Sequence, residues 1–323
     1  MLRYDNLICG RRTAPASGRW LPSLDPYRNE VWCEIPDSGA ADVDAAVAAA
    51  RAAFTSPAWS GCTATARGAL LRRLGDLIAQ NAQRLAELEV RDNGKLLNEM
   101  LLQLRYLPQW FHYYGGLADK VEGAVLPIDK ADHFVYTTWE PLGVVAAITA
   151  WNSPLLLLTW KLAPGLAAGN TFVVKPSEFA SVSTLAFAEL FEQAGFPPGV
   201  VNVVCGTGQG VGAPLVAHPD VAKVAFTGSD ATGRAINRSA AGALKHVTLE
   251  LGGKSPNIVF ADADLAAAAA GVASGIFAAA GQTCIAGSRL LVQRPIYDAF
   301  LEQVCALARD IRIGDPMDPD TQM

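Results

Sequence analysis

From Gly143 onward the sequence consists of short apolar runs that alternate with helical stretches, and this alternation limits the possible folds more than any other feature. The runs are rich in valine and alanine, and they are Val144–Ile148, Thr171–Val174, Val200–Val204, Val221–Phe226 and His246–Leu249. Each is followed by Gly, Pro or Asn and then by residues with helical spacing. Such alternation is typical of βαβ units. It predicts an α/β protein with a Rossmann-like, doubly wound parallel sheet.

Different patterns stand on either side of these runs. Two long segments with helical periodicity precede them, Ala41–Phe54 and Ala66–Asn93, and a third extends to Tyr114. Residues 121–141 contain an alternating stretch that favours a β-hairpin arm. After Gly252 a further α/β unit begins with the predicted strand Pro256–Phe260.

Composition narrows the class of ligand. The 323 residues carry a formal charge of -5, and their basic residues are scattered, so we expect neither nucleic acid nor a membrane surface as partner. No apolar run approaches the ~20 residues that span a bilayer, and no leader pattern opens the chain. The six cysteines are dispersed without C-x-x-C spacing. We therefore expect a cytoplasmic protein with reduced thiols, no structural metal and a small-molecule ligand.

Cys284 and Glu250 are candidates for a nucleophile and its base. Cys284 stands among small residues and glycines, where a substrate can approach, although a lone cysteine is more often a small buried apolar residue. Glu250 follows an apolar run and precedes Gly252. A carboxylate at the carboxyl end of a strand lies where open α/β sheets bind ligands, and it could deprotonate a thiol or a water.

A second group of candidates lies between the run Val144–Ile148 and the next helix, Leu155–Ala168. Asn152 could direct its amide at a developing oxyanion, or Trp151-Asn152-Ser153-Pro154 could be an ordinary helix start. The two interpretations are compatible. Lys161, two turns further on, is either a surface charge or a group that moves protons.

Three later segments are candidates for binding a nucleotide. Lys175 and Glu178 follow a strand and could bind ribose hydroxyls, or they could form a solvated ion pair. Ser229, after Phe226-Thr227-Gly228, starts a helix whose backbone N–H groups suit a pyrophosphate. Residues 208–213 match G-x-G-x-x-A but follow a late strand, so their glycines favour either close cofactor approach or a turn.

Together these motifs resemble the aldehyde dehydrogenase superfamily, over residues from about Tyr4 to Met323. Six motifs occur in family order: Trp-Asn-x-Pro, Lys-Pro-Ser-Glu, Gly-Phe-Pro-Pro-Gly-Val-Val-Asn, Phe-Thr-Gly-Ser, Glu-Leu-Gly-Gly-Lys and Gly-Gln-x-Cys. The resemblance implies an NAD-binding domain of residues 1–120 and 142–251, an oligomerisation arm of residues 121–141, and the start of a catalytic domain at residues 252–323. It also implies a homodimer or homotetramer in full-length relatives.

The resemblance assigns roles to individual residues. Cys284 would attack an aldehyde, Asn152 would stabilise the oxyanion, Glu250 would activate the hydrolytic water, and Lys161 would help to move protons. NAD is the implied cofactor, with NADP as the alternative. The residues implied to bind it are Ile148, Trp151, Lys175, Ser177, Glu178, Gly208, Gly212, Phe226, Thr227, Gly228, Ser229, Leu251 and Gly252.

Relatives extend for roughly half this length again, so we expect the catalytic domain to be incomplete and these 323 residues to have little or no activity alone. One alternative is a non-catalytic NAD-binding fragment or interaction module. Another is a CoA-acylating aldehyde dehydrogenase, which Glu250 disfavours because transfer to a thiol needs no water-activating base.

Overall fold

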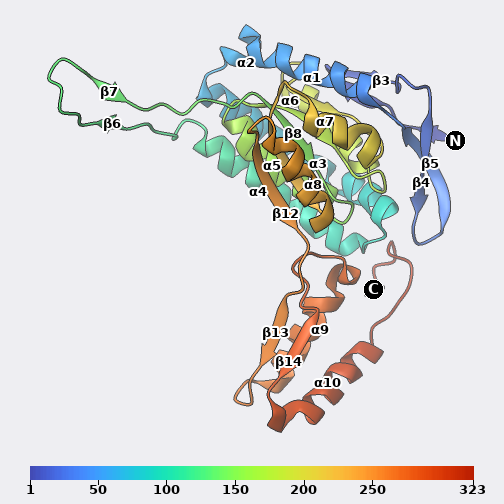
Figure 1. The fold of residues 1–323 in the computed structure, drawn as a ribbon. Coiled ribbons are helices and arrows are strands. Elements are labelled where there is room, and N and C mark those ends of the chain that lie inside the picture. The colour runs from blue at the N-terminus through green and yellow to red at the C-terminus, as the bar shows by residue number, and fades with distance from the viewer.

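A seven-stranded sheet forms the centre of the protein, as the computed structural model of residues 1–323 shows (Figure 1). Five parallel strands appear in the order β12-β11-β8-β9-β10. Their bounds are β8 Val144–Ile148, β9 Thr171–Lys175, β10 Val201–Val203, β11 Val221–Gly228 and β12 His246–Leu251. The prediction of a doubly wound parallel sheet is confirmed, and the five strands overlap the five apolar runs.

Two short antiparallel strands extend this sheet beyond β10. They are β2, Asn6–Ile8, and β3, Arg11–Thr13, at the N-terminal end of the chain. These two strands were not predicted from the sequence, because three residues carry too little alternation to indicate a strand. Asn6 secures β2 by accepting a hydrogen bond from the backbone N–H of Cys205 at 2.9 Å.

Helices cover both faces of the sheet, which explains why its strands read as continuous apolar runs. Along β8, Val145 and Ala147 belong to one core cluster, whereas Val144, Ala146 and Ile148 belong to the other. The larger cluster packs against α3 (Ala64–Asn93), α4 (Leu97–Leu117), α5 (Pro154–Ala167) and α6 (Val182–Ala194). The smaller packs against α1 (Ala40–Thr55), α7 (Ala213–Ala217) and α8 (Asp230–Ala241).

Helices α3 and α4 form an antiparallel pair whose close approach depends on glycine. A Cβ atom at Gly68 would clash with the carbonyl oxygen of Gly115, so the two backbones are nearly in contact there. Helix α3 ends at Gly94, which has a left-handed φ of 71° and hydrogen-bonds back to Val90. The short helix α2, Pro57–Ser60, joins α1 to this pair.

Three smaller sheets lie outside the central one, and two of them precede it or interrupt it in the first half of the chain. Strands β4 (Trp20–Asp25) and β5 (Glu30–Pro36) form a hairpin that β1 (Leu2–Arg3) joins in parallel. Strands β6 (Val125–Leu126) and β7 (Val135–Tyr136) pair at residues 121–141, and this hairpin extends far from the rest of the molecule (Figure 1).

Residues 256–309 form a smaller unit below the sheet in the view of Figure 1, and the chain after them returns to α4, where the backbone N–H of Leu97 donates to the carbonyl of Pro316 at 2.9 Å. Its parallel strands β13 (Pro256–Val259) and β14 (Arg289–Val292) pack with α9 (Leu265–Phe277) and α10 (Tyr297–Arg309) around a small core that includes Phe300. The helical turns η2 (Ala278–Gly281) and η3 (Arg294–Ile296) complete it. No helix of the protein is both long and apolar enough to cross a bilayer.

Candidate active site

One cavity of about 1040 Å³ lies at the carboxyl ends of β8, β9 and β11 and reaches the loop before β14. All thirteen residues that the sequence analysis proposed for cofactor binding line it, namely Ile148, Trp151, Lys175, Ser177, Glu178, Gly208, Gly212, Phe226, Thr227, Gly228, Ser229, Leu251 and Gly252. Parallel strands bring these residues together because their carboxyl ends meet at one edge of the sheet. Asn152 and Cys284 line the same cavity.

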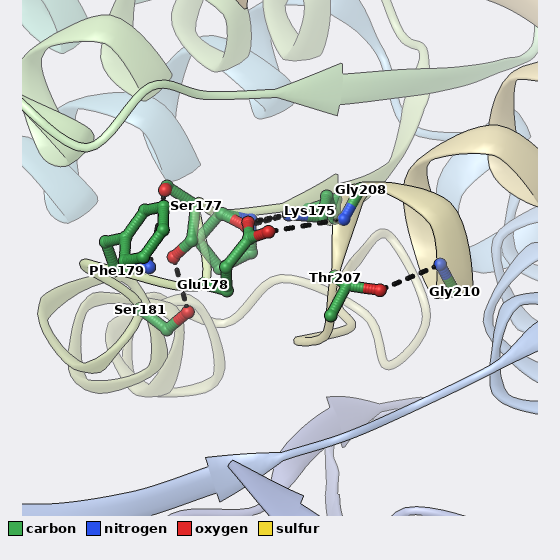
Figure 2. A network of polar contacts seen from close by, with 9 residues as sticks. Lys175, Ser177, Glu178, Phe179, Ser181, Thr207, Gly208 and Gly210 are labelled. Carbon is green, nitrogen blue, oxygen red and sulfur yellow. Dashed lines mark hydrogen bonds and ion pairs between the residues drawn. The ribbon is translucent and has the colours of Figure 1, made fainter. Parts of the chain in front are cut away.

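A charged pair marks one end of this cavity (Figure 2). The side chain of Lys175 is only 4% exposed, and its ammonium lies 3.0 Å from Glu178 and donates to the carbonyl of Pro176 at 2.8 Å. Burial raises the pKa of Glu178, but Lys175 and hydrogen bonds outweigh burial and leave the pKa lowered. One of those hydrogen bonds comes from the backbone N–H of Gly208 at 3.4 Å. The interpretation as a solvated ion pair is wrong, because Lys175 is buried.

Two helix starts face the cavity near this pair. The turn η1, Gly208–Gly212, is capped by Thr207, whose hydroxyl accepts from the N–H of Gly210 at 2.9 Å. Open space surrounds Gly208 where a side chain would stand. Ser229 caps α8 by accepting from the N–H of Thr232 at 3.2 Å. Free N–H groups at such helix starts attract anionic oxygens.

Cys284 lies in an exposed loop that meets the segment carrying Asn152. The amide of Asn152 donates a hydrogen bond to the carbonyl oxygen of Gln282 at 2.9 Å. Gln282, Thr283 and Cys284 all line the cavity, and Cys284 is exposed to solvent. The structure therefore brings the candidate nucleophile and the candidate oxyanion donor to one place.

Lys161 and Glu250 lie beside the cavity and do not line it. Lys161, on α5, donates to the hydroxyl of Thr227 at 2.6 Å and to the carbonyl of Leu157 at 3.3 Å. Burial lowers the pKa of its ammonium to about 8, against the opposing charge of Glu250. Glu250 is an exposed residue of β12, paired in register with Thr227. Lys161 is thus no ordinary surface charge.

Sequence reasoning missed two residues of this site. Thr207 caps the glycine-containing turn, and its place before Gly208 was the available signal. Gln282 supplies the backbone oxygen that holds Asn152, and nothing in its side chain indicates this contact because a carbonyl group belongs to every residue.

Comparison with known proteins identifies the family. The model of the aldehyde dehydrogenase family matches residues 13–323, and the chain belongs to this family. It is 48% identical over 300 residues to (Z)-2-((N-methylformamido)methylene)-5-hydroxybutyrolactone dehydrogenase of Acinetobacter baylyi, covering 93% of this chain and 62% of that protein.

Solved structures agree with this assignment. The crystal structure of PnpE in complex with nicotinamide adenine dinucleotide is 48% identical, with a TM-score of 0.96 over 99% of this chain and 65% of that one. The betaine aldehyde dehydrogenase of Staphylococcus aureus in complex with NAD+ is 39% identical, with a TM-score of 0.97 over 100% of this chain and 64% of that one. The chain thus spans just under two thirds of the length of these relatives.

Proposed function

We propose that this protein contributes the cofactor site and the nucleophile of an NAD-dependent aldehyde dehydrogenase. One observation carries the proposal: Cys284 and Asn152 line the same cavity as the Lys175–Glu178 ion pair, whose lysine is buried. Two relatives in this family were solved with NAD bound. We propose residues 1–120 and 142–251 as the NAD-binding domain and residues 252–323 as part of the catalytic domain.

The cavity suits a dinucleotide on its own chemistry. Lys175 and Glu178 present a fixed donor and acceptor for ribose hydroxyls, and the carboxylate of Glu178 disfavours an added 2′-phosphate, which supports NAD over NADP. The N-terminus of α8 and the open space at Gly208 suit the pyrophosphate and an adjacent group. When bound here, NAD would supply the acceptor for a hydride from the substrate carbon.

The residues of this chain would perform the remaining chemistry. The thiolate of Cys284 attacks the aldehyde carbon, and one N–H of the Asn152 amide with the backbone N–H of Cys284 stabilises the oxyanion. With the hydride removed in this way, the sulfur of Cys284 would hold the acyl group as a thioester. Water then attacks the thioester, with Glu250 accepting the water's proton, and the carboxylic acid leaves as the thiol is restored.

We propose that Lys161 helps this proton to leave. Its ammonium contacts Thr227, and the neighbouring strand carries Glu250 in register with Thr227. Because burial lowers the pKa of Lys161 to about 8, the lysine exchanges its proton near neutral pH. Glu250 as the water-activating base favours hydrolysis over transfer to CoA.

The assembly and the level of activity belong to the proposal too. The hairpin of residues 121–141 exposes Phe134, Tyr136 and Trp139, as an oligomerisation arm of a homodimer or homotetramer would.

Cys284 is exposed, whereas an oxyanion is stabilised best where water is excluded. We therefore expect slow turnover from these 323 residues alone, and NAD binding without chemistry is the second candidate function.

The test combines a binding measurement with an activity assay on the wild type, Cys284→Ser and the control Cys62→Ser. We expect all three to bind NAD with similar affinity, and only Cys284→Ser to lose aldehyde-dependent NADH formation. Binding without NADH formation in the wild type favours the second candidate. No NAD binding, or full activity in Cys284→Ser, would overturn the proposal.

A further inference from the structure

A short segment far from Cys284 in sequence contacts both loops of the proposed reaction centre. Residues 93–99 join the end of α3 to the first turn of α4. The segment reverses at Gly94, whose left-handed φ of 71° and closeness to the side chain of Pro26 leave no room for a Cβ atom. Three side chains of this segment, those of Asn93, Lys95 and Glu99, contact the two loops of the proposed reaction centre.

Asn93 and Lys95 hold the segment that carries Asn152. The ammonium of Lys95, which is only 1% exposed, donates to the hydroxyl of Ser153 at 3.1 Å. The amide of Asn93 donates to the backbone carbonyl of Asn152 at 3.4 Å, and its oxygen accepts from the N–H of Lys95 at 3.0 Å. A buried lysine is costly, so its presence beside Ser153 suggests a specific use.

Glu99 holds the loop that carries Cys284. Both carboxylate oxygens of Glu99 accept from the backbone N–H of Ala279, at 2.9 and 3.1 Å. Ala279 and Ala280 have left-handed φ angles of 56° and 52°, and Gly281 follows with 69°. Left-handed backbone is unfavourable for alanine and persists only where the surroundings impose it. The Glu99 carboxylate is one such constraint, and it acts at Ala279, five residues before Cys284.

We propose that Asn93, Lys95 and Glu99 are positioning residues, which together fix the Asn152 segment against the Cys284 loop. The proposal rests on the proposed function in taking Cys284 as the nucleophile and Asn152 as the oxyanion donor. The hydrogen bond from Asn152 to Gln282 is the direct link between the two loops, and residues 93–99 support it from both sides.

The charges in this cluster support the same assignment. Burial lowers the pKa of the Lys95 ammonium, while the negative charges of Glu89, Glu99 and Cys284 raise it. Lys95 therefore lies within electrostatic reach of both the loop support and the nucleophile.

The test compares two reactions of Cys284 that need no cofactor. Acyl transfer from p-nitrophenyl acetate forms the Cys284 thioester and releases p-nitrophenolate through an oxyanion, so it needs both the thiolate and the Asn152 amide. Alkylation by iodoacetamide forms a carbon–sulfur bond and releases iodide without an oxyanion. The ratio of the two rates at Cys284, followed by mass spectrometry, measures the alignment of the two loops.

Four variants of the whole chain are compared with the wild type. Glu99→Ala and Lys95→Met should each lower the ratio about tenfold, the size expected when one charged hydrogen bond is lost. Glu99→Gln keeps an acceptor for Ala279 and should stay within about threefold of the wild type. Glu302→Gln removes an exposed carboxylate of α10 and should leave the ratio unchanged.

Several outcomes would overturn the inference. These are an unchanged ratio in Glu99→Ala and Lys95→Met, equal slowing of both reactions, failure of Glu99→Gln to restore the ratio, or a wild-type Cys284 that is not acylated. If Glu99→Ala or Lys95→Met misfolds, the hydrogen-exchange rate of the Ala279 amide is compared between Glu99→Gln and Glu302→Gln instead. An exchange rate more than tenfold faster in Glu99→Gln would count against its role as an acceptor. A normal ratio pattern without NADH formation would instead refute the proposed function alone.

Discussion

Glu89, on α3, offers a test of how the buried charges behind the site affect stability. Its side chain is fully buried, and neither carboxylate oxygen has a hydrogen-bond partner within 3.5 Å. Burial raises its pKa from 4.5 to about 8, Asp92 adds to the rise, and Lys95 and the N–H of Leu155 oppose it. We expect Glu89→Gln, a neutral side chain of the same shape, to remove this titration.

The sign and size follow from proton linkage. Because the pKa is higher in the folded protein, the folded state keeps a proton that the unfolded state releases between pH 4.5 and about 8. The stabilisation is complete below pH 4.5 and is lost as the pH rises through about 8. At ~1.4 kcal/mol per pH unit, Glu89→Gln should gain about 4 kcal/mol over the wild type between pH 5 and pH 8.

Urea denaturation at several pH values between 5 and 8 measures this difference directly. Glu302→Gln, which removes an exposed carboxylate, should differ from the wild type by a constant amount of less than ~0.5 kcal/mol. If the difference between Glu89→Gln and the wild type does not change with pH, Glu89 does not titrate in the folded protein and the reasoning fails.

Three further predictions follow from contacts in the structure. Glu178→Gln should weaken NAD binding about tenfold in a calorimetric titration, because a charged acceptor is lost, and unchanged affinity would argue against ribose binding there. Burial lowers the pKa of Lys161 to about 8, so the wild type should gain stability relative to Lys161→Met as the pH rises from 8 to 10, and a constant difference in denaturation midpoints would contradict this. Gly68→Ala should reduce the free energy of unfolding by about 1–3 kcal/mol because it separates α3 from α4, whereas Gly116→Ala, with open space, should not destabilise the protein.

The sequence predicted the central sheet well because burial on both faces imposes continuous apolar runs. Val144–Ile148 was predicted with the bounds that the structure shows, since each of its residues belongs to one of the two core clusters. The thirteen proposed cofactor residues converge on one cavity for a related reason, as strand ends share one edge of the sheet. Their role in binding stays a prediction.

Features that depend on contacts between distant segments could not be predicted in this way. The hydrogen bonds from Lys95 to Ser153 and from Ala279 to Glu99 join residues 58 and 180 positions apart. Local propensity also fails at Ala279 and Ala280, because alanine favours right-handed helix and the surrounding structure imposes the opposite hand. Glu250 is an exposed residue of β12 that lies beside the cavity and does not line it, so its role as the base stays a prediction.

The cavity joins two units of the chain, with the central sheet on one side and the loop of residues 281–284 on the other. A ligand that contacts both sides also holds the two units together. Ligand binding and the ordered arrangement of the two units are then thermodynamically linked. A ligand at a hundred times its dissociation constant adds about 2.7 kcal/mol to the state that binds it. The loop of residues 281–284 would then be held most firmly when the cavity is filled.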